Sequence, residues 1–389
     1  MKKLNLSTVM VLAAFMMMGC YNAKAKKVSD DAIASPAETI ATKIQVAMLL
    51  DTSGSMGGLI EQAKSRLWNI VNTLTTLKFE GKTPQIEIAL YEYGNNRIPS
   101  SELYIRQVAP LTTDLDLISE KLFALHTDGG EEFCGTVIDK AVKRLKWSNG
   151  KADMKLIYIA GNEPFSQGPI SYKTAISNAL AHDIYVNTIH CGNNGWGGID
   201  EWRDGAKRGE GKFFNIDHNA RVRHYETPYD DAISERNMKL NDTYVSYSRV
   251  GVVQKENQMK QDENAKSLSS ANYAERAVSK TKKAYTNSSW DLVDKVSADA
   301  GALDKIGQNE LAEELQNKTK EEIKAFVAEK KQERESIQKE IADLAQKRQA
   351  YIDEQTKKDN DNTGDDLGAA INQSVLDLAL LKGYEQVQE

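Results

Sequence analysis

The chain has 389 residues, 27% of them charged and 40% hydrophobic, and its formal net charge is −6 at pH 7. This length suits one domain of about 190 residues followed by a second, different segment. The sequence holds no basic patch with interleaved aromatic residues, and the charge balance is acidic. These features argue against nucleic acid as a partner.

The first twenty residues are typical of an export signal. Two lysines precede the apolar run 9–18, which is too short to span a bilayer, and Gly19 and Cys20 follow directly. This order resembles a bacterial lipoprotein signal, which implies a signal peptide over residues 1–19 and acylation of Cys20, for example with palmitate. An ordinary secretory peptide with a chance cysteine is the alternative. Residues 20–42 predict a flexible tether, so we expect a lipid-anchored protein of the bacterial cell envelope, in the outer membrane or facing the periplasm.

Strand-like and helix-like patterns alternate between residues 43 and 224. Continuous apolar runs predict strands, and apolar residues three and four positions apart predict helices. The predicted strands are 44–50, 86–93, 154–160 and 184–190, and the predicted helices are 59–77, 115–125, 136–145, 172–182 and one near residue 202. The alternation predicts an α/β domain with a doubly wound, mostly parallel sheet and helices on both faces.

The composition changes beyond about residue 225. Lys, Glu, Gln, Asn and Ala dominate there, which predicts a mainly α-helical region over residues 225–389. Residues 313–355 keep an apolar rhythm over only about two to three heptads, so a helical hairpin or short coiled coil is expected. Residues 373–381 predict a short amphipathic helix that docks on the protein's own helices rather than on a membrane.

The segment Asp51-Thr52-Ser53-Gly54-Ser55 follows the first predicted strand directly. A carboxylate and two hydroxyls at alternating positions of one loop are the oxygen ligands that Mg²⁺ prefers. Such residues are also ordinary turn and capping material, so the place of the loop between a strand and a helix carries the prediction. The pattern Asp-x-Ser-x-Ser resembles the metal-ion-dependent adhesion site of the von Willebrand factor A (vWA) family. This resemblance implies that Asp51, Ser53 and Ser55 are metal ligands.

The same resemblance implies two further metal-binding loops. Thr136 opens a predicted helix, as the hydroxyl ligand of the family's second loop does, although helix capping alone would also explain it. Thr127 and Asp128, just upstream, are reserve candidates. The third loop departs from the family's Thr-Asp-Gly, because Gly161-Asn162-Glu163 stands there and the usual carboxylate is missing. Asn162 offers an amide oxygen and Glu163 a longer carboxylate instead, so weaker cation binding is predicted.

Two cysteines remain beyond Cys20. Cys134 precedes a predicted helix and Cys191 ends a predicted strand, which places both on the same edge of the sheet. In an oxidising compartment this favours the hypothesis of a disulfide between them. A nucleophilic cysteine paired with His126 or His190 is the alternative, but no orienting pattern accompanies it.

The vWA resemblance implies a non-enzymatic binding module. It would hold Mg²⁺ or another divalent cation, and an acidic residue of a protein partner would complete the metal shell. The Gly/Trp-rich loop 193–202 is a candidate recognition surface, unless Trp196 and Trp202 pack beneath it. The alternative is an envelope scaffold that acts through its C-terminal helices and has a vestigial metal site. A hydrolase is least favoured, because the sequence has no Gly-x-Ser-x-Gly, His-Glu-x-x-His or phosphate-binding loop.

Overall fold

The computed structural model describes residues 42–192, 198–358 and 367–387. The predicted signal peptide, Cys20, the tether up to residue 41 and Trp196 lie outside the described residues. From residue 41 onward the chain forms one compact unit.

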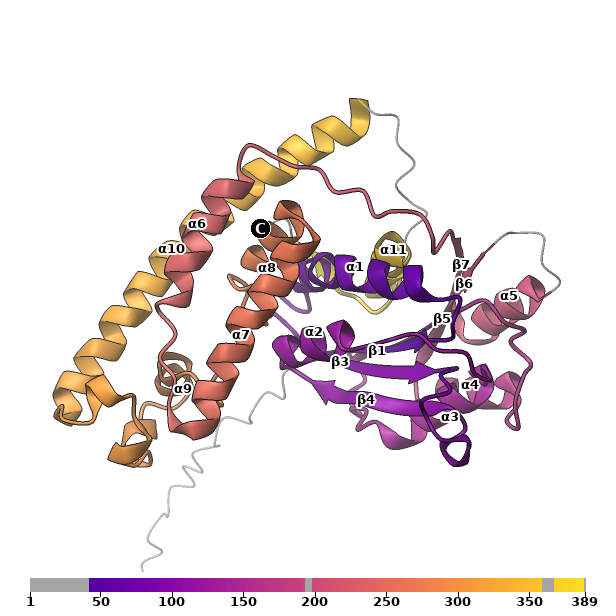
Figure 1. Cartoon of the computed structure of the whole chain (residues 1–389), viewed down its shortest axis with the longest axis horizontal. Helices are drawn as coiled ribbons and strands as arrows, with labels where there is room; N and C mark the ends of the chain where they lie inside the picture. The colour runs from indigo at the N-terminus through magenta and orange to yellow at the C-terminus, as the bar shows by residue number, and fades with distance from the viewer. Residues whose placement is uncertain (1–41, 193–197, 359–366, 388–389) are drawn as a thin grey trace, which may run out of the picture. The chain divides into compact units, whose positions relative to one another are not determined.

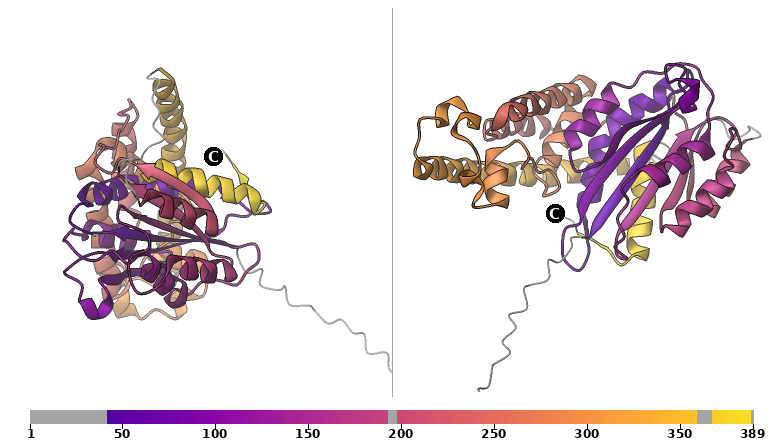
Figure 2. Two further views of the ribbon diagram at one scale, coloured as in Figure 1. Left: turned by 90° about the vertical axis from the view of Figure 1, so that its right-hand side faces the viewer. Right: turned by 90° about the horizontal axis from the view of Figure 1, so that it is seen from below.

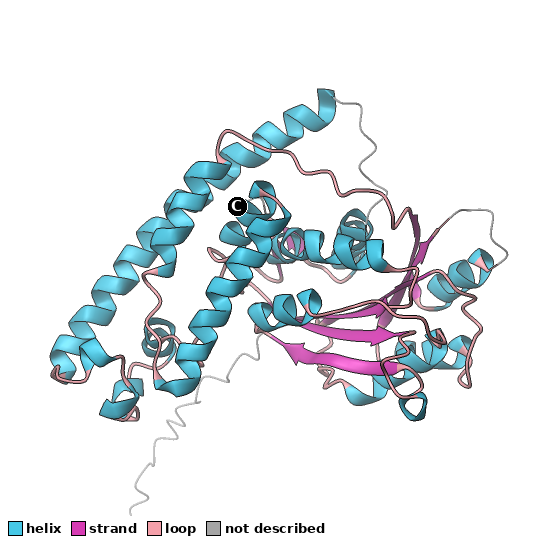
Figure 3. Cartoon of the chain, viewed as in Figure 1, coloured by secondary structure: helices cyan, strands magenta, loops and turns pink. Residues whose placement is uncertain are grey.

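Six strands form the central sheet, in the order β4-β3-β1-β5-β6-β7 (Figures 1 and 3). Their bounds are β1 (Lys43–Asp51), β3 (Gln85–Tyr93), β4 (Ile105–Thr112), β5 (Met154–Gly161), β6 (Tyr185–Cys191) and β7 (Glu210–Ile216). All neighbours are parallel except β3 and β4, which are antiparallel. Asp51 stands opposite Tyr93 of β3, and Leu50 opposite Ala160 of β5, so three strands end together at one edge. The predicted doubly wound, mostly parallel sheet is confirmed.

The two outer strands were not predicted. β4 carries the exposed residues Arg106, Gln107 and Pro110, and β7 is half-buried over most of its length. Outer strands have only one sheet neighbour and part of their surface in solvent, so they lack the continuous apolar run that marks a central parallel strand.

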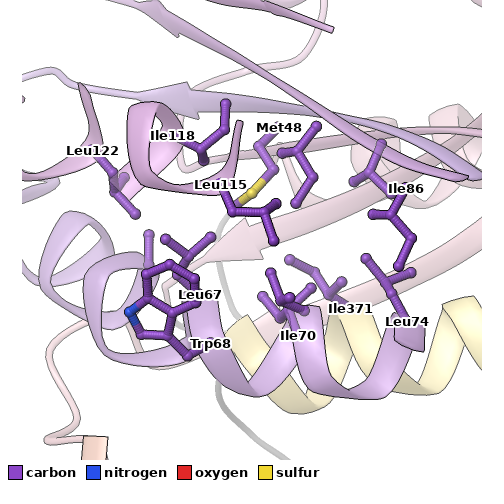
Figure 4. Packing of buried hydrophobic residues seen from close by; sticks show 14 of the residues in the cluster. Met48, Leu67, Trp68, Ile70, Leu74, Ile86, Leu115, Ile118, Leu122 and Ile371 are labelled. Carbon is purple, nitrogen blue, oxygen red and sulfur yellow. The ribbon is translucent and has the colours of Figure 1, made fainter. Parts of the chain in front are cut away.

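Helices cover both faces of the sheet (Figure 1). They are α1 (Gly57–Thr75), α2 (Leu115–Phe123), α3 (Cys134–Arg144), α4 (Tyr172–Ala181) and α5 (Ile199–Arg208). Because side chains alternate along a strand, Met48 packs on the face of α1 and α2, whereas Leu49 packs on the face of α3 and α4. Figure 4 shows the first of these cores, which includes Trp68 and Ile70 of α1.

The region after the sheet is helical, as predicted. It comprises α6 (Asp230–Asn241), α7 (Ser248–Leu268), α8 (Ser270–Ser279), α9 (Leu292–Ala298), α10 (Lys320–Lys358) and α11 (Leu367–Leu381). Short 3₁₀ helices lie at Ser100–Glu102, Ala302–Asp304, Gln308–Glu310 and Glu313–Leu315. None of the described helices is long and apolar enough to cross a membrane.

Of the two forms expected near residues 313–355, the helical hairpin is not formed. Lys320–Lys358 is one continuous helix of 39 residues, with no glycine or proline to interrupt it. Its apolar rhythm looked broken because Arg334 and Arg348 occupy core-facing positions, where both are buried and paired with carboxylates. A charged side chain can continue a buried stripe when its charge is paired there.

The last helix docks on the protein's own fold, as predicted. α11 packs against α1 and the strands β5, β6 and β7, and in both views of Figure 2 the yellow helix lies beside the sheet. The Tyr158 hydroxyl of β5 lies 2.6 Å from the Ser374 hydroxyl of α11. After α11, the two-residue strand β8 (Glu385–Gln386) pairs with β2 (Leu77–Lys78), which closes the chain back onto the end of α1.

Candidate functional site

Asp51 is a fully buried carboxylate at the end of β1. Its Oδ1 accepts a hydrogen bond of 2.7 Å from the Ser53 amide, while its Oδ2 has no partner. Burial raises the pKa of Asp51 to about 8, and the nearby carboxylates of Glu132 and Glu163 add to the rise, against the lowering effect of Ser53. A carboxylate in this state needs either a proton or a cation.

Three more buried oxygens at this edge lack a hydrogen-bond partner. They are Ser53 Oγ, Thr136 Oγ1 and Asn162 Oδ1, from the loops after β1, at the start of α3 and after β5. Buried polar atoms without a partner are uncommon, because each loses its interaction with water and gains nothing. A set of carboxylate, hydroxyl and amide oxygens matches the ligands of a hard divalent cation. The residues present therefore fit such an ion.

The packing of α3 places Thr136 at this edge of the sheet. It lies in the first turn of α3, two residues after Cys134, whose Sγ is 3.8 Å from the Tyr93 hydroxyl. A side chain at Gly135 would collide with the backbone of Ile170 and Tyr172, so only glycine lets α3 approach here.

Ser55 and Glu163 lie on the solvent side of the site. Ser55 is exposed, and its Oγ accepts a hydrogen bond of 3.3 Å from Nδ2 of Asn162. Glu163 is half-buried and accepts a hydrogen bond of 3.4 Å from Gln167. The reserve candidate Asp128 turns away, because its carboxylate pairs with Arg97 at 3.4 Å.

The missing carboxylate of the third loop has a steric explanation. A Cβ built on Gly161 would lie 3.0 Å from Oδ2 of Asp51 and would collide with the Tyr93 hydroxyl. Tyr93 is fully buried and donates a hydrogen bond of 3.0 Å to the Ala160 carbonyl, so it cannot move aside easily. The space that an aspartate would need at position 161 is therefore already filled.

Sequence reasoning missed Glu132. This residue lies in the loop before α3 and is half-buried beside Asp51 and Ser53. Burial and the neighbouring Glu163 raise the pKa of Glu132 to about 7. The Ser53 hydroxyl acts in the opposite direction and lowers this pKa, but no regular hydrogen bond joins the side chains of Ser53 and Glu132. The only sequence signal was the acidic character of the loop 126–132, which does not distinguish Glu132 from its neighbours.

The loop that carries Glu132 is fastened to its neighbours by hydrogen bonds. Nδ2 of Asn95 donates to the Thr52 carbonyl at 3.3 Å and to the His126 carbonyl at 2.8 Å. The Asp128 amide donates to the same Thr52 carbonyl at 3.0 Å. Most of these partners are backbone groups. The loops after β1, after β3 and before α3 therefore hold a defined arrangement around Asp51.

The disulfide hypothesised between Cys134 and Cys191 is not formed, and both residues are free thiols. Cys134 packs in the core on the α3 side of the sheet and Cys191 in the core on the α1 side, so their side chains point to opposite faces. Burial raises the pKa of both thiols well above the ordinary value, which disfavours a nucleophilic thiolate. His190 instead pairs with Oδ1 of Asn215 at 2.6 Å.

Trp202 lies in α5 and is buried, so it is not part of a recognition surface. It is fully buried against Phe165, with ring centroids 4.6 Å apart. Its Nε1 donates a hydrogen bond of 2.9 Å to the Glu163 carbonyl, and this bond fixes the backbone of the third loop.

Carboxylates alone do not make this site. Within residues 42–192, 198–358 and 367–387, no three His, Cys, Asp or Glu side chains are arranged as a metal site by themselves. A cation here would depend on the hydroxyl and amide oxygens as well.

A protein-family model agrees with this architecture. Residues 45–223 match the family model of the von Willebrand factor type A domain. A conserved hypothetical protein BatB from Bacteroides thetaiotaomicron is similar in structure, with 16% identity over 45% of this chain and 90% of that one and a TM-score of 0.34. The SpRpn10 VWA domain aligns with 18% identity over 46% and 88% of the two chains, with a TM-score of 0.34.

Proximal thread matrix protein 1 from the mussel byssus, solved with a zinc-occupied MIDAS motif, aligns with 13% identity, 45% and 42% coverage and a TM-score of 0.35. A search of curated protein sequences finds no match. With its parallel sheet, its Asp-x-Ser-x-Ser loop after β1 and the family match, the segment 45–223 of this chain is a von Willebrand factor type A domain.

Proposed function

We propose that this chain is a non-enzymatic, lipid-anchored protein of the bacterial cell envelope, and that its vWA domain binds a protein partner through a divalent cation. Four buried oxygen atoms without partners, on Asp51, Ser53, Thr136 and Asn162, are the observation that supports this most strongly. The proposed domains are the vWA domain over residues 43–224 and the helical region over residues 225–389.

In this proposal, Asp51, Ser53, Ser55 and Thr136 hold the ion, with Glu163 at the solvent side. The ion supplies positive charge with an open coordination position, and an acidic side chain of the partner fills that position. The other ligands and the binding surface come from residues of this chain. Asp51 supplies negative charge, the hydroxyls supply neutral oxygens, and the exposed side of the loop leaves room for the partner.

The cell-envelope location rests on the lipoprotein-like signal at residues 1–20. Acylation at Cys20 would leave the vWA domain tethered to a membrane by lipid, with residues 21–42 as the spacer.

Metal titration of the full-length chain tests the proposal. Isothermal titration with Mg²⁺ and Mn²⁺ should show one site, and Asp51→Ala should lose it because the buried carboxylate is the main negative group. Asp128→Ala is the matched control, since this carboxylate lies on the same edge but pairs with Arg97 in solvent. Capture of a partner from envelope extract should then require both the ion and Asp51.

The alternative function is an envelope scaffold that acts through the C-terminal helices. One observation favours it: four apolar side chains of α7 are half or more exposed, namely Val250, Val252, Val253 and Met259. Capture of a partner that is unchanged in EDTA and in Asp51→Ala would support the scaffold over the metal-bridged receptor.

A further inference from the structure

We propose that Glu132 is a further anionic ligand of this cation beside Asp51, in place of the aspartate that is missing at position 161. The inference rests on the proposed function, because it assigns one more ligand to the same site. Glu132 reaches the site from the loop before α3, a different element from the one that carries Gly161.

The Glu132 side chain lies next to that of Asp51. A Cβ built on Gly94 would lie 3.0 Å from Oδ1 of Asp51 and 2.9 Å and 3.6 Å from Cγ and Cδ of Glu132. The two side chains therefore pack against the same small patch of backbone, next to each other. A larger residue at position 94 would separate them.

In the described part of the chain, no lysine, arginine or histidine forms an ion pair with Asp51 or Glu132. Asp51 Oδ2 and Ser53 Oγ are buried and without partners. Two neighbouring carboxylates and an unpartnered hydroxyl, with no positive side chain among them, are complementary to a bound cation.

The usual position of the carboxylate, after β5, is closed. Tyr93 and Asp51 fill the space beside Gly161, so a carboxylate at that position has no room. Asn162, the next residue, contributes only a neutral oxygen. Glu163 of the same loop lies at the solvent side and accepts a hydrogen bond from Gln167, whereas the half-buried Glu132 lies next to Asp51 and is the better placed second carboxylate.

The loop before α3 holds the backbone of Glu132 in place. A side chain at Gly130 would lie 2.6 Å from the Gly94 carbonyl, so this approach of the two loops requires glycine. The Asn96 amide donates a hydrogen bond of 2.7 Å to the Gly129 carbonyl, and the Cys134 amide donates one of 3.2 Å to the Glu132 carbonyl. The backbone that carries Glu132 is thus held in place before an ion arrives.

A second carboxylate on this chain changes the order in which the ion and the partner bind. Two carboxylates neutralise a divalent cation, so the ion needs no acidic group from the partner for charge balance. The ion is then retained by the chain alone, and the partner binds to a site that is already loaded.

Binding of Mn²⁺ to the full-length chain, followed by the electron paramagnetic resonance signal of free Mn²⁺, tests the inference. Glu132→Gln keeps the shape of the side chain and removes its charge, and should weaken binding about ten-fold or more, because the lost charge lies close to the ion in a partly buried site. Glu131→Gln is the matched control. Glu131 is adjacent in sequence but exposed, and its substitution should change the dissociation constant less than about two-fold.

Melting of both variants in EDTA shows whether they remain folded, and Glu132→Asp provides a second variant that keeps the charge and should bind more tightly than Glu132→Gln. If the unmodified chain and Glu132→Gln bind Mn²⁺ equally well, Glu132 is not a ligand, although the proposed metal site stands. If the unmodified chain itself takes up no Mn²⁺, the proposed function and this inference fail together.

Discussion

At the scale of single residues, the site combines two carboxylates with too little charge compensation. Burial raises the pKa of Asp51 to about 8 and that of Glu132 to about 7, well above the values of exposed carboxyl groups. Such an arrangement destabilises the chain without a cation, because folding must take up protons or bury negative charge. A bound divalent cation would remove this cost. The same two residues would then lower the stability of the cation-free chain and raise that of the cation-bound chain.

Asp51→Asn should therefore stabilise the cation-free chain. Between about pH 4 and the folded-state pKa of about 8, the unfolded chain has released the Asp51 proton and the folded chain retains it. The free energy of unfolding thus falls as pH rises through this window. Asp51→Asn has no carboxyl group to titrate at this position, so its free energy of unfolding does not fall in this way. At pH 8 in EDTA we expect it to exceed that of the unmodified chain by about 2–4 kcal/mol.

Urea denaturation from pH 4 to pH 8 measures this effect, with Asp128→Asn as the control. The control should keep the pH slope of the unmodified chain, because Asp128 is not buried. If the free energy of unfolding of Asp51→Asn depends on pH as steeply as that of the unmodified chain, Asp51 is not desolvated in solution.

At the scale of helices, buried arginines join distant segments of the chain, and one of them, Arg276, reaches from the helical region to the vWA domain. Arg276 of α8 is fully buried and donates to Asp262 of α7 at 2.5 Å and to Asp116 of α2 at 2.7 Å. Its guanidinium also lies 4.6 Å from the ring centre of Trp68 in α1. Arg334 and Arg348 of α10 pair with Asp291 and Asp230 within the helical region. Each arginine connects helices that are distant in the sequence.

Arg276→Met should destabilise the chain by about 3–5 kcal/mol. The change leaves Asp116 and Asp262 buried with fewer positive partners, and a buried charge without compensation is costly. The free energy of unfolding in urea measures the loss. Lys239→Ala, which removes an exposed pair with Glu235, should cost less than about 1 kcal/mol, and equal losses in both variants would argue against the network.

At the scale of the whole molecule, the last helix completes the core of the vWA domain. Ile371 and Val375 of α11 are fully buried in the same core as Trp68 and Met48, and Figure 4 shows Ile371 beside α1. The Leu367 amide donates a hydrogen bond of 3.2 Å to the Gln62 side chain. Removal of residues 225–389 would expose this face of the sheet, so such a deletion tests stability rather than partner choice.

Ile371→Ala should therefore lower the free energy of unfolding by about 2–4 kcal/mol, the range for a large aliphatic side chain lost from a packed core. Leu381→Ala lies on the same helix, but its side chain is 84% exposed, and its effect should stay within about 0.5 kcal/mol. Thermal melts of the two variants at equal concentration measure the difference. Similar melting temperatures would mean that α11 is not bound to the sheet in solution.

Much of the fold was predictable from the sequence. The four inner strands, their helices and the place of the Asp51 loop follow from apolar runs and helical spacing, which are local consequences of burial. The same patterns predicted the helical C-terminal region and the docking of its last helix. They failed for β4 and β7, whose partly exposed residues form strands only because a neighbouring strand offers its backbone.

The sequence by itself thus determined the order of the elements and the loop that ends β1, because contiguous residues carry that information. Only the tertiary structure decided what surrounds Asp51. Tyr93 closes the space beside Gly161, Glu132 arrives from a loop about 80 residues away along the chain, and the two cysteines face opposite sides of the sheet. These relations depend on side-chain volume and on the packing of distant segments, for which no local pattern exists.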